Sequence, residues 1–224
     1  MAERASLAEP TYRLIPSRFP PVSAFEDVTS AEDLPAVMEL EGWTNDRLVE
    51  TRLSRLPRDR WIFGRSNASV VMAAFLHSAP NGARFTGPDL GAWYASLSER
   101  TAIAEVAHHL RRQALNEGRQ SDRMIFRCYG ARLAGDNYLD LRGAHSARPE
   151  LYDRRRYGKS QLFGEAERAA GRDGLLYDSL RHAGGTNAVC FDPTKVLDVV
   201  QRDHFEVQVR TDPGRKILAV RLPA

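Results

Sequence analysis

The sequence has 224 residues, of which 42% are hydrophobic and 27% charged, and 32 basic side chains against 29 acidic ones give a formal net charge of +3. This length and composition predict one domain with its own core, and the nearly balanced charge argues against binding of nucleic acid through a broad basic face. No apolar run approaches the roughly 20 residues of a membrane span, and no signal peptide is evident. Two cysteines, Cys128 and Cys190, are too few for a disulfide framework, so we expect a cytoplasmic protein.

The basic residues are almost all arginines. Only Lys159, Lys195 and Lys216 are lysines, and the other 29 are arginines. Arginine offers a planar fork for carboxylates and phosphates, whereas lysine offers a point charge. Either codon bias in the source genome explains the excess, or some of these arginines hold a phosphorylated ligand.

The first third of the chain is predicted to be a short strand followed by a helical section. The strand covers residues 12–15 and is stopped by Pro16. Ser30, followed closely by two acidic residues, is a helix-start signal, and the last predicted helix of the section covers 68–76. We therefore expect a helical insertion over about residues 30–76.

From residue 84 onward the pattern changes to short apolar strands with two interspersed helices. Ser98 is the predicted start of a helix that runs to about Asn116, and a second helix is predicted at 160–170. This mixture predicts an α+β fold in which residues 1–224 form a single domain. The predicted strands cover 91–97, 124–129, 138–141, 174–179, 188–191, 196–200, 205–210 and 217–222.

Three familiar motifs fail on spacing or context. The run 158–160 (Gly-Lys-Ser) ends like a P-loop, but Asp153 stands where that motif requires a glycine. His108 and His109 are adjacent and lack the i, i+4 spacing of a helical zinc pair, which favours a surface or interface role. Cys190 lies in an apolar strand without a neighbouring histidine, and we expect it in the core.

One ordered set of motifs is spread over most of the chain. It opens with a Tyr-Arg pair at 12–13. Arg84 follows, ahead of a Gly-containing loop and of the predicted strand that carries Tyr94. Glu105 stands 11 residues after Tyr94, in an Ala-x-x-Glu pattern on the next helix.

The set closes with Ser179 at the end of a late strand and with a Gly-Gly-x-Asn-x-Val-x-Phe run at 184–191. Taken together, these motifs resemble the RES domain, a family named after an arginine, a glutamate and a serine. Two features differ from its common pattern. The helical section at 30–76 lengthens the gap between the first two arginines and could cap the site or offer a surface to an acceptor protein. The loop 84–90 reads Arg-Phe-Thr-Gly-Pro-Asp-Leu where Gly-Arg-Trp-Asn is common.

The resemblance implies a fold and a function. It implies a fold like that of ADP-ribosyltransferases such as diphtheria toxin, with short mixed or antiparallel sheets and flanking helices. RES proteins are toxins of toxin–antitoxin pairs that use NAD+ as a consumed co-substrate. We expect cleavage of the nicotinamide–ribose bond and transfer of ADP-ribose to a protein; the alternative acceptors are water and phosphate, which would deplete NAD+. The expected partner is an antitoxin with a helix-turn-helix DNA-binding domain that blocks the NAD+ cleft.

The matched residues suggest catalytic roles. Breaking the nicotinamide–ribose bond builds positive charge on the ribose, and we expect the Glu105 carboxylate to stabilise that charge. Tyr94 would offer the cationic nicotinamide a stacking face. Ser179 would bind the ribose or orient Glu105. No metal is expected, because the leaving group already carries positive charge.

The remaining matched residues suggest roles in substrate binding. Arg13 and Arg84 are candidates to clamp the pyrophosphate with charge-assisted hydrogen bonds. Asn187 and Arg181 lie close to Ser179 in the sequence and are further candidates.

A different class of function stays open. The run 154–156 consists of three arginines with Tyr152 and Tyr157 beside it, so a non-catalytic module that binds nucleic acid is an alternative. Such a run is also compatible with a solvated loop or with an acidic partner.

Overall fold

The sheet is the central element of the molecule. The computed structural model describes residues 4–19, 25–26, 54–212 and 217–223. Within these residues, nine strands form one sheet in the order β1-β5-β6-β7-β3-β2-β4-β8-β9, and all neighbours are antiparallel except β5 and β6. The strands are β1 (Arg4–Ala5), β2 (Thr11–Pro16), β3 (Trp93–Ser96), β4 (Ser121–Leu133), β5 (Tyr138–Asp140), β6 (Gly174–Asp178), β7 (Thr186–Cys190), β8 (Val196–Arg210) and β9 (Ile217–Leu222).

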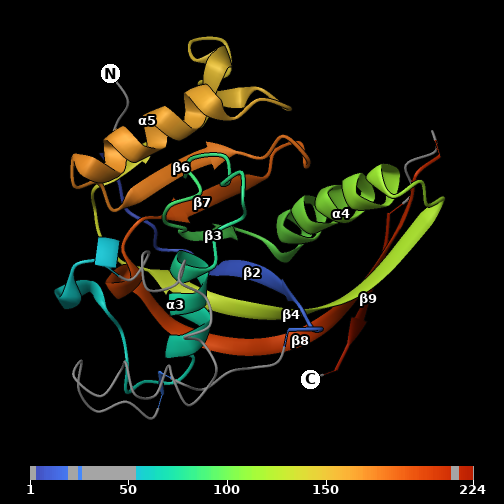
Figure 1. The fold of residues 1–224 in the computed structure, drawn as a ribbon, viewed down its shortest axis with the longest axis horizontal. Coiled ribbons are helices and arrows are strands. Elements are labelled where there is room, and N and C mark those ends of the chain that lie inside the picture. The colour runs from blue at the N-terminus through green and yellow to red at the C-terminus, as the bar shows by residue number, and fades with distance from the viewer. Residues whose placement is uncertain (1–3, 20–24, 27–53, 213–216, 224) are drawn as a thin grey trace.

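The helices pack on different parts of this sheet (Figure 1). Helix α3 (Ala68–Leu76) contacts β3, α4 (Glu99–Asn116) contacts β2, β4 and β8, and α5 (Gly158–Ala169) contacts β6. No helix in the described part of the chain is long and apolar enough to cross a membrane. Short 3-10 turns lie at Arg58–Arg60, Pro149–Tyr152 and Pro193–Lys195.

Two apolar clusters hold the layers together. The larger one contains Phe75 of α3 with Trp93 and Val189 of the sheet, all fully buried. The smaller one lies under α4, where Leu110 packs near Phe126. Burial of side chains of this size stabilises the fold by about 1.5–3 kcal/mol each.

The sheet divides into two halves between β2 and β3. These strands pair only through Tyr12 and Ser96, whereas β3 pairs with β7 over four residues and β2 pairs with β4 over six. Figure 1 shows β6 and β7 above this seam and β4 and β8 below it. Because a single pair leaves most of both strands unjoined, side chains beside the seam stay open to a ligand.

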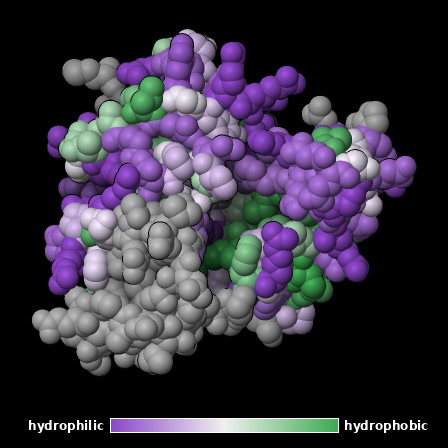
Figure 2. All heavy atoms as spheres, viewed as in Figure 1, coloured by the Kyte–Doolittle hydropathy of each residue, from purple (hydrophilic) through white to green (hydrophobic). Residues whose placement is uncertain are grey.

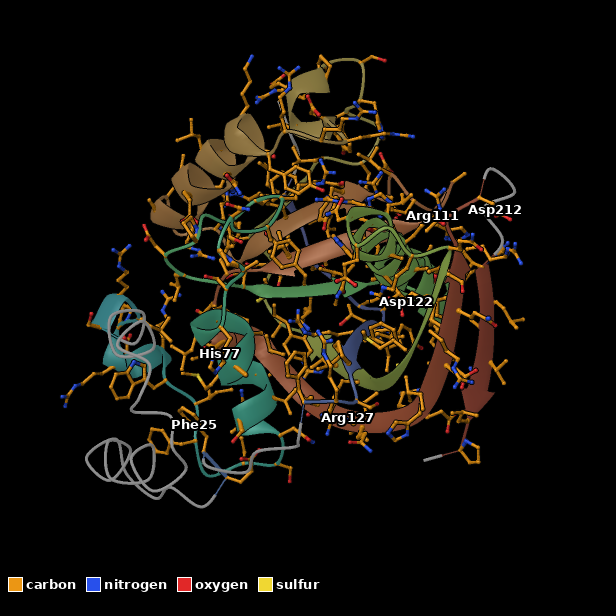
Figure 3. All side chains as sticks on the ribbon, turned by 45° about the vertical axis from the view of Figure 1, so that its right-hand side comes forward. Phe25, His77, Arg111, Asp122, Arg127 and Asp212 are labelled. Carbon is orange, nitrogen blue, oxygen red and sulfur yellow. The ribbon has the colours of Figure 1, made fainter. Side chains whose placement is uncertain are left out.

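Helix α4 lies beside the seam and is fixed at both ends. The Ser98 hydroxyl accepts a hydrogen bond from the Thr101 backbone N–H, which satisfies a donor at the helix N-terminus. In the last two turns, the Arg111 guanidinium donates to the backbone carbonyls of Arg210 and Thr211, close to Asp212 (Figure 3). The helix is therefore tied to the connection between β8 and β9.

Most of the predicted elements are confirmed. The α+β class is confirmed, as are the helix at 68–76, the helix that starts after Ser98 and runs to Asn116, and the strand at 12–15, which extends by one residue at each end. Cys190 is fully buried, and burial raises the pKa of its thiol to about 12. The helices expected between 30 and 53 lie outside the described residues, so the expected insertion stays a prediction there.

The prediction of two separate strands at 196–200 and 205–210 was wrong. One continuous strand, β8, covers both, and it bends where its pairing with β4 shifts register between Arg127 and Tyr129 and between Gly130 and Arg132. The four polar residues between the two apolar segments, 201–204, lie within this strand and are exposed or half-buried.

Gly164 provides a test of how α5 packs. A Cβ at this position would lie 2.1 Å from the Phe85 backbone oxygen, whereas a Cβ at Gly158, on the same helix, would meet nothing within 4 Å. We expect Gly164→Ala to lower the free energy of unfolding by about 1–3 kcal/mol, and Gly158→Ala to leave it unchanged or raise it by up to about 1 kcal/mol. Urea denaturation measures both. Equal effects of the two substitutions would contradict this packing.

Candidate active site

A pocket of about 350 Å³ opens at the seam between β2 and β3, within the size range of small-molecule sites. Figure 2 shows a recess on this face beside the start of α4, with hydrophobic residues inside and hydrophilic ones around it. The pocket is lined from β2, β3, α4, the loop before β3 and the turn after β6. Of the residues predicted from the sequence, those that line it are Arg13, Arg84, Tyr94, Glu105, Arg181 and Asn187.

The Glu105 carboxylate is held in one orientation. Its Oε1 accepts hydrogen bonds from the Ser179 hydroxyl at 2.7 Å and from the Asn187 amide nitrogen at 2.8 Å. No hydrogen bond to Oε2 is found among the described residues. One carboxylate oxygen is therefore occupied by the protein, and the other is available to a ligand in the pocket.

Ser179 contributes through Glu105. Its oxygen accepts from the backbone N–H groups of Arg181 and His182, at 3.1 and 3.0 Å. With both lone pairs used, its hydroxyl proton points to Glu105. Ser179 does not itself line the pocket, so of its two expected roles the geometry favours orienting Glu105.

The orientation of the Asn187 amide depends on Ser96, which the sequence analysis missed. The buried Ser96 hydroxyl donates to Asn187 Oδ1 at 2.7 Å. This leaves the Asn187 nitrogen to face Glu105. The available signal was a serine two residues after Tyr94 in the same predicted strand, but a polar residue in a short strand gives no hint of its partner.

Tyr94 is anchored by its hydroxyl. The oxygen accepts from the Phe85 backbone N–H at 3.0 Å and shares a hydrogen bond with Thr86 Oγ1 at 3.1 Å. Burial raises the pKa of Tyr94 to about 12, so it stays neutral at physiological pH. The ring lines the pocket, where it can stack on a planar group.

Arg13 is a cation that no acidic side chain pairs with in the ranges that the structure describes. One of its terminal nitrogens donates to the Tyr94 carbonyl at 2.9 Å, and the guanidinium lies 5.0 Å from the centre of the Trp93 ring. Its Nε is buried and unpaired, and no carboxylate of the described residues forms an ion pair with it. Desolvation lowers its pKa to about 10. A buried cation in this state favours an anion in the pocket.

Arg84 also lies at the pocket but is partly engaged. Its Nη1 donates to the carbonyls of Leu151 and Asp153, at 3.0 and 2.9 Å, and its guanidinium faces the Tyr157 ring at 4.7 Å. Its other nitrogens form no hydrogen bond with the described residues. Arg84 therefore links the pocket to the segment that follows the 3-10 turn at Pro149–Tyr152.

The pocket also contains residues that the motifs did not indicate. His109 lines it, four residues after Glu105 on α4, so the i, i+4 spacing could have placed the two side chains on one face. Tyr157 and Tyr177 line it from separate segments, and nothing in the sequence connects them. Within the described residues, no group of three metal-binding side chains is found.

Comparison with known proteins now identifies the family. A family model for the RES domain matches residues 52–210. The chain belongs to the RES domain family. Glu105, Ser179 and Asn187 lie within the matched region, while Arg13 precedes it.

Two individual proteins are similar to this RES chain. The uncharacterized protein y4oC of Sinorhizobium fredii (strain NBRC 101917 / NGR234) is 34% identical over 113 residues, which cover 50% of this chain and 47% of that protein. The chain thus aligns with about half the length of that relative. The crystal structure of the M. tuberculosis MbcT-MbcA toxin-antitoxin complex matches with a TM-score of 0.50 and 14% identity, covering 91% of this chain and 86% of that one. The likeness confirms the expected fold.

The lone Arg13 cation leads to a prediction about stability. We expect Arg13→Met to raise the free energy of unfolding by about 1 kcal/mol at neutral pH, because an apolar side chain of similar length removes a desolvated charge. The pKa of Arg13 is lower in the folded state than in the unfolded state. The buried charge therefore lowers the free energy of unfolding at neutral pH, and this destabilisation is relieved only as the pH rises beyond about 10.

Urea denaturation measures the change, with Arg123→Met, at an exposed position on β4, as the control. Inorganic pyrophosphate should raise the melting temperature of the wild type and not that of Arg13→Met. A loss of stability together with unchanged stabilisation by pyrophosphate would show that Arg13 has a structural role instead.

Proposed function

We propose that the pocket binds NAD+, that the chain cleaves its nicotinamide–ribose bond, and that the ADP-ribose passes to a protein acceptor. The observation that carries the proposal is that one pocket contains two side chains of opposite charge. Arg13 is a cation without an acidic partner among the described residues, and Glu105 is an oriented carboxylate with one oxygen that no described residue hydrogen-bonds. NAD+ has the matching charges, since its pyrophosphate is anionic and its reacting ribose becomes cationic.

The reaction follows from this charge distribution. As the C–N bond to nicotinamide breaks, the electron pair leaves with nicotinamide, which departs neutral, and positive charge develops on the ribose. Glu105 Oε2 would stabilise that charge, and the hydrogen bonds from Ser179 and Asn187 keep the carboxylate in place before the reaction begins. The acceptor forms the new bond to the ribose carbon and loses its proton to solvent.

The other pocket residues would bind the substrate. Tyr94, fixed by its hydroxyl, offers its ring to the nicotinamide. Arg13 and the remaining nitrogens of Arg84 would hold the pyrophosphate. NAD+ is consumed in this scheme.

The comparisons support a role as a toxin. The chain is a RES protein, and its structural neighbour is described as part of a toxin–antitoxin complex. We propose that it acts in the cytoplasm as the toxin of such a pair. Its partner would be an antitoxin that blocks the pocket and carries a helix-turn-helix DNA-binding domain.

Glu105→Gln tests the chemistry. The amide keeps the size of the side chain and removes its charge, so we expect the rate of nicotinamide release to fall by about 10²–10³-fold, with KM for NAD+ changed by less than about threefold. Glu117→Gln, at the exposed end of α4, is the control and should keep the wild-type rate. A Glu105→Gln variant with full activity would overturn the catalytic assignment.

To identify the acceptor of ADP-ribose, the protein is incubated with cell lysate and with NAD+ that is labelled in its adenylate part. Transfer to a protein predicts label that stays on one protein band after denaturation, because ADP-ribose is then covalently bound. The same sample with Glu105→Gln should show no labelled band. Label found only in ADP-ribose or its phosphate ester would replace the protein acceptor by water or phosphate and leave the cleavage itself intact.

A further inference from the structure

The three arginines at 154–156 lie at the rim of the pocket. Arg84 donates to the carbonyl of Asp153, and the Arg181 guanidinium donates to the carbonyl of Arg154 at 3.4 Å. Both Arg84 and Arg181 line the pocket. Two pocket residues therefore hold the backbone of this segment.

The same segment is also fixed from within. The Asp153 carboxylate accepts from the backbone N–H groups of Arg155 and Arg156, at 2.7 and 2.9 Å. The arginine run therefore has a defined backbone, while its side chains extend into solvent. A fixed backbone lowers the entropy lost when such side chains bind a partner.

Within the part of the chain that the structure describes, the side chains of this run are paired with few acidic residues. Among the described residues, Arg154 and Arg155 form no ion pair, and Arg156 has only a contact of 3.5 Å with Asp153. Lys159, exposed at the start of α5, adds a cation that forms no ion pair with the described residues. Three exposed arginines of β4 and β8, by contrast, do pair with carboxylates: Arg123 with Glu206, Arg132 with Asp198 and Arg210 with Asp212.

The aromatic residues beside the run exclude one class of partner. Proteins that bind single-stranded nucleic acid stack bases on available aromatic rings. Tyr152 is buried, donates its hydroxyl to the Leu141 carbonyl and stacks on His145, and the Tyr157 ring faces Arg84. Tyr152 thus offers no face to a base, and Tyr157, with Arg84 over one face, offers at most one, which is too little to stack successive bases. Duplex binding would call for a broader basic face than this short run.

We propose that the segment 154–156, with Lys159, is a docking site for an acidic segment of a partner protein. Carboxylates match the planar forks of the arginines and need no stacking surface. A partner docked there would lie at the rim of the pocket and restrict the access of substrate to it. This effect on the reaction rests on the proposed function, whereas the docking itself does not.

Fluorescence anisotropy with a labelled oligoglutamate peptide tests the docking. The full chain should bind the peptide, and binding should weaken as salt is raised. The variant Arg154→Ala/Arg155→Ala/Arg156→Ala should bind at least about tenfold more weakly, which is the scale of a few exposed charge pairs lost together. Arg123→Ala/Arg132→Ala/Arg210→Ala removes the same net charge on β4 and β8 and should bind within about twofold of the wild type.

The possible outcomes separate the proposals. Equal weakening in both triple variants, or no binding by the wild type, would overturn the docking site. Binding of oligothymidylate that is tighter than that of the peptide and lost only in the 154–156 variant would assign the segment to nucleic acid. The peptide should also slow nicotinamide release by the wild type and not by the 154–156 variant; a chain that releases no nicotinamide contradicts the proposed reaction but leaves the anisotropy test valid.

Discussion

The carboxylate of Glu105 is the point at which separate parts of the chain meet. Its Oε1 receives hydrogen bonds from Ser179, in the turn after β6, and from Asn187 on β7, and the Asn187 amide is in turn oriented by Ser96 on β3. Glu105 Oε1 on α4 is thus connected directly to the turn after β6 and to β7, and through Asn187 to β3. The pocket depends on this connection, because β2 and β3 themselves share a single residue pair.

The excess of arginine has several physical roles in the structure. Arg111 ties a helix to a strand connection through backbone carbonyls, and Arg84 does the same for the segment beside the pocket. Arg13 is different, because it brings a charge into the pocket that no carboxylate in the described part of the chain balances. The number of arginines does not show which of them serve a ligand; only the partners of each one do.

Features of this site that depend on residues close together in the sequence could be predicted from local patterns, whereas those that depend on contacts between distant residues could not. The helix after Ser98 follows from local capping and periodicity, so its bounds were predicted closely. Residues far apart, such as Arg13 and Glu105, were placed in one site by the ordered motifs of a family and not by any local pattern. The bend of β8 and the hydrogen bond between Ser96 and Asn187 depend on strand pairing across the sheet. The residues nearby in sequence do not encode such pairing.

The close approach of α5 at Gly164 has a consequence for how the pocket can move. Without a Cβ, the helix backbone lies directly against Phe85, and the Gln161 side chain binds the carbonyls of Asn81 and Ala83 in the same loop. This wall of the pocket is therefore as rigid as the helix itself. The turn that carries Ser179 and Gly185 is held as well, by the hydrogen bond from Ser179 to Glu105 and by the one from the Ser179 backbone N–H to the Gly185 carbonyl. A movement of this turn would therefore also move a group that orients Glu105.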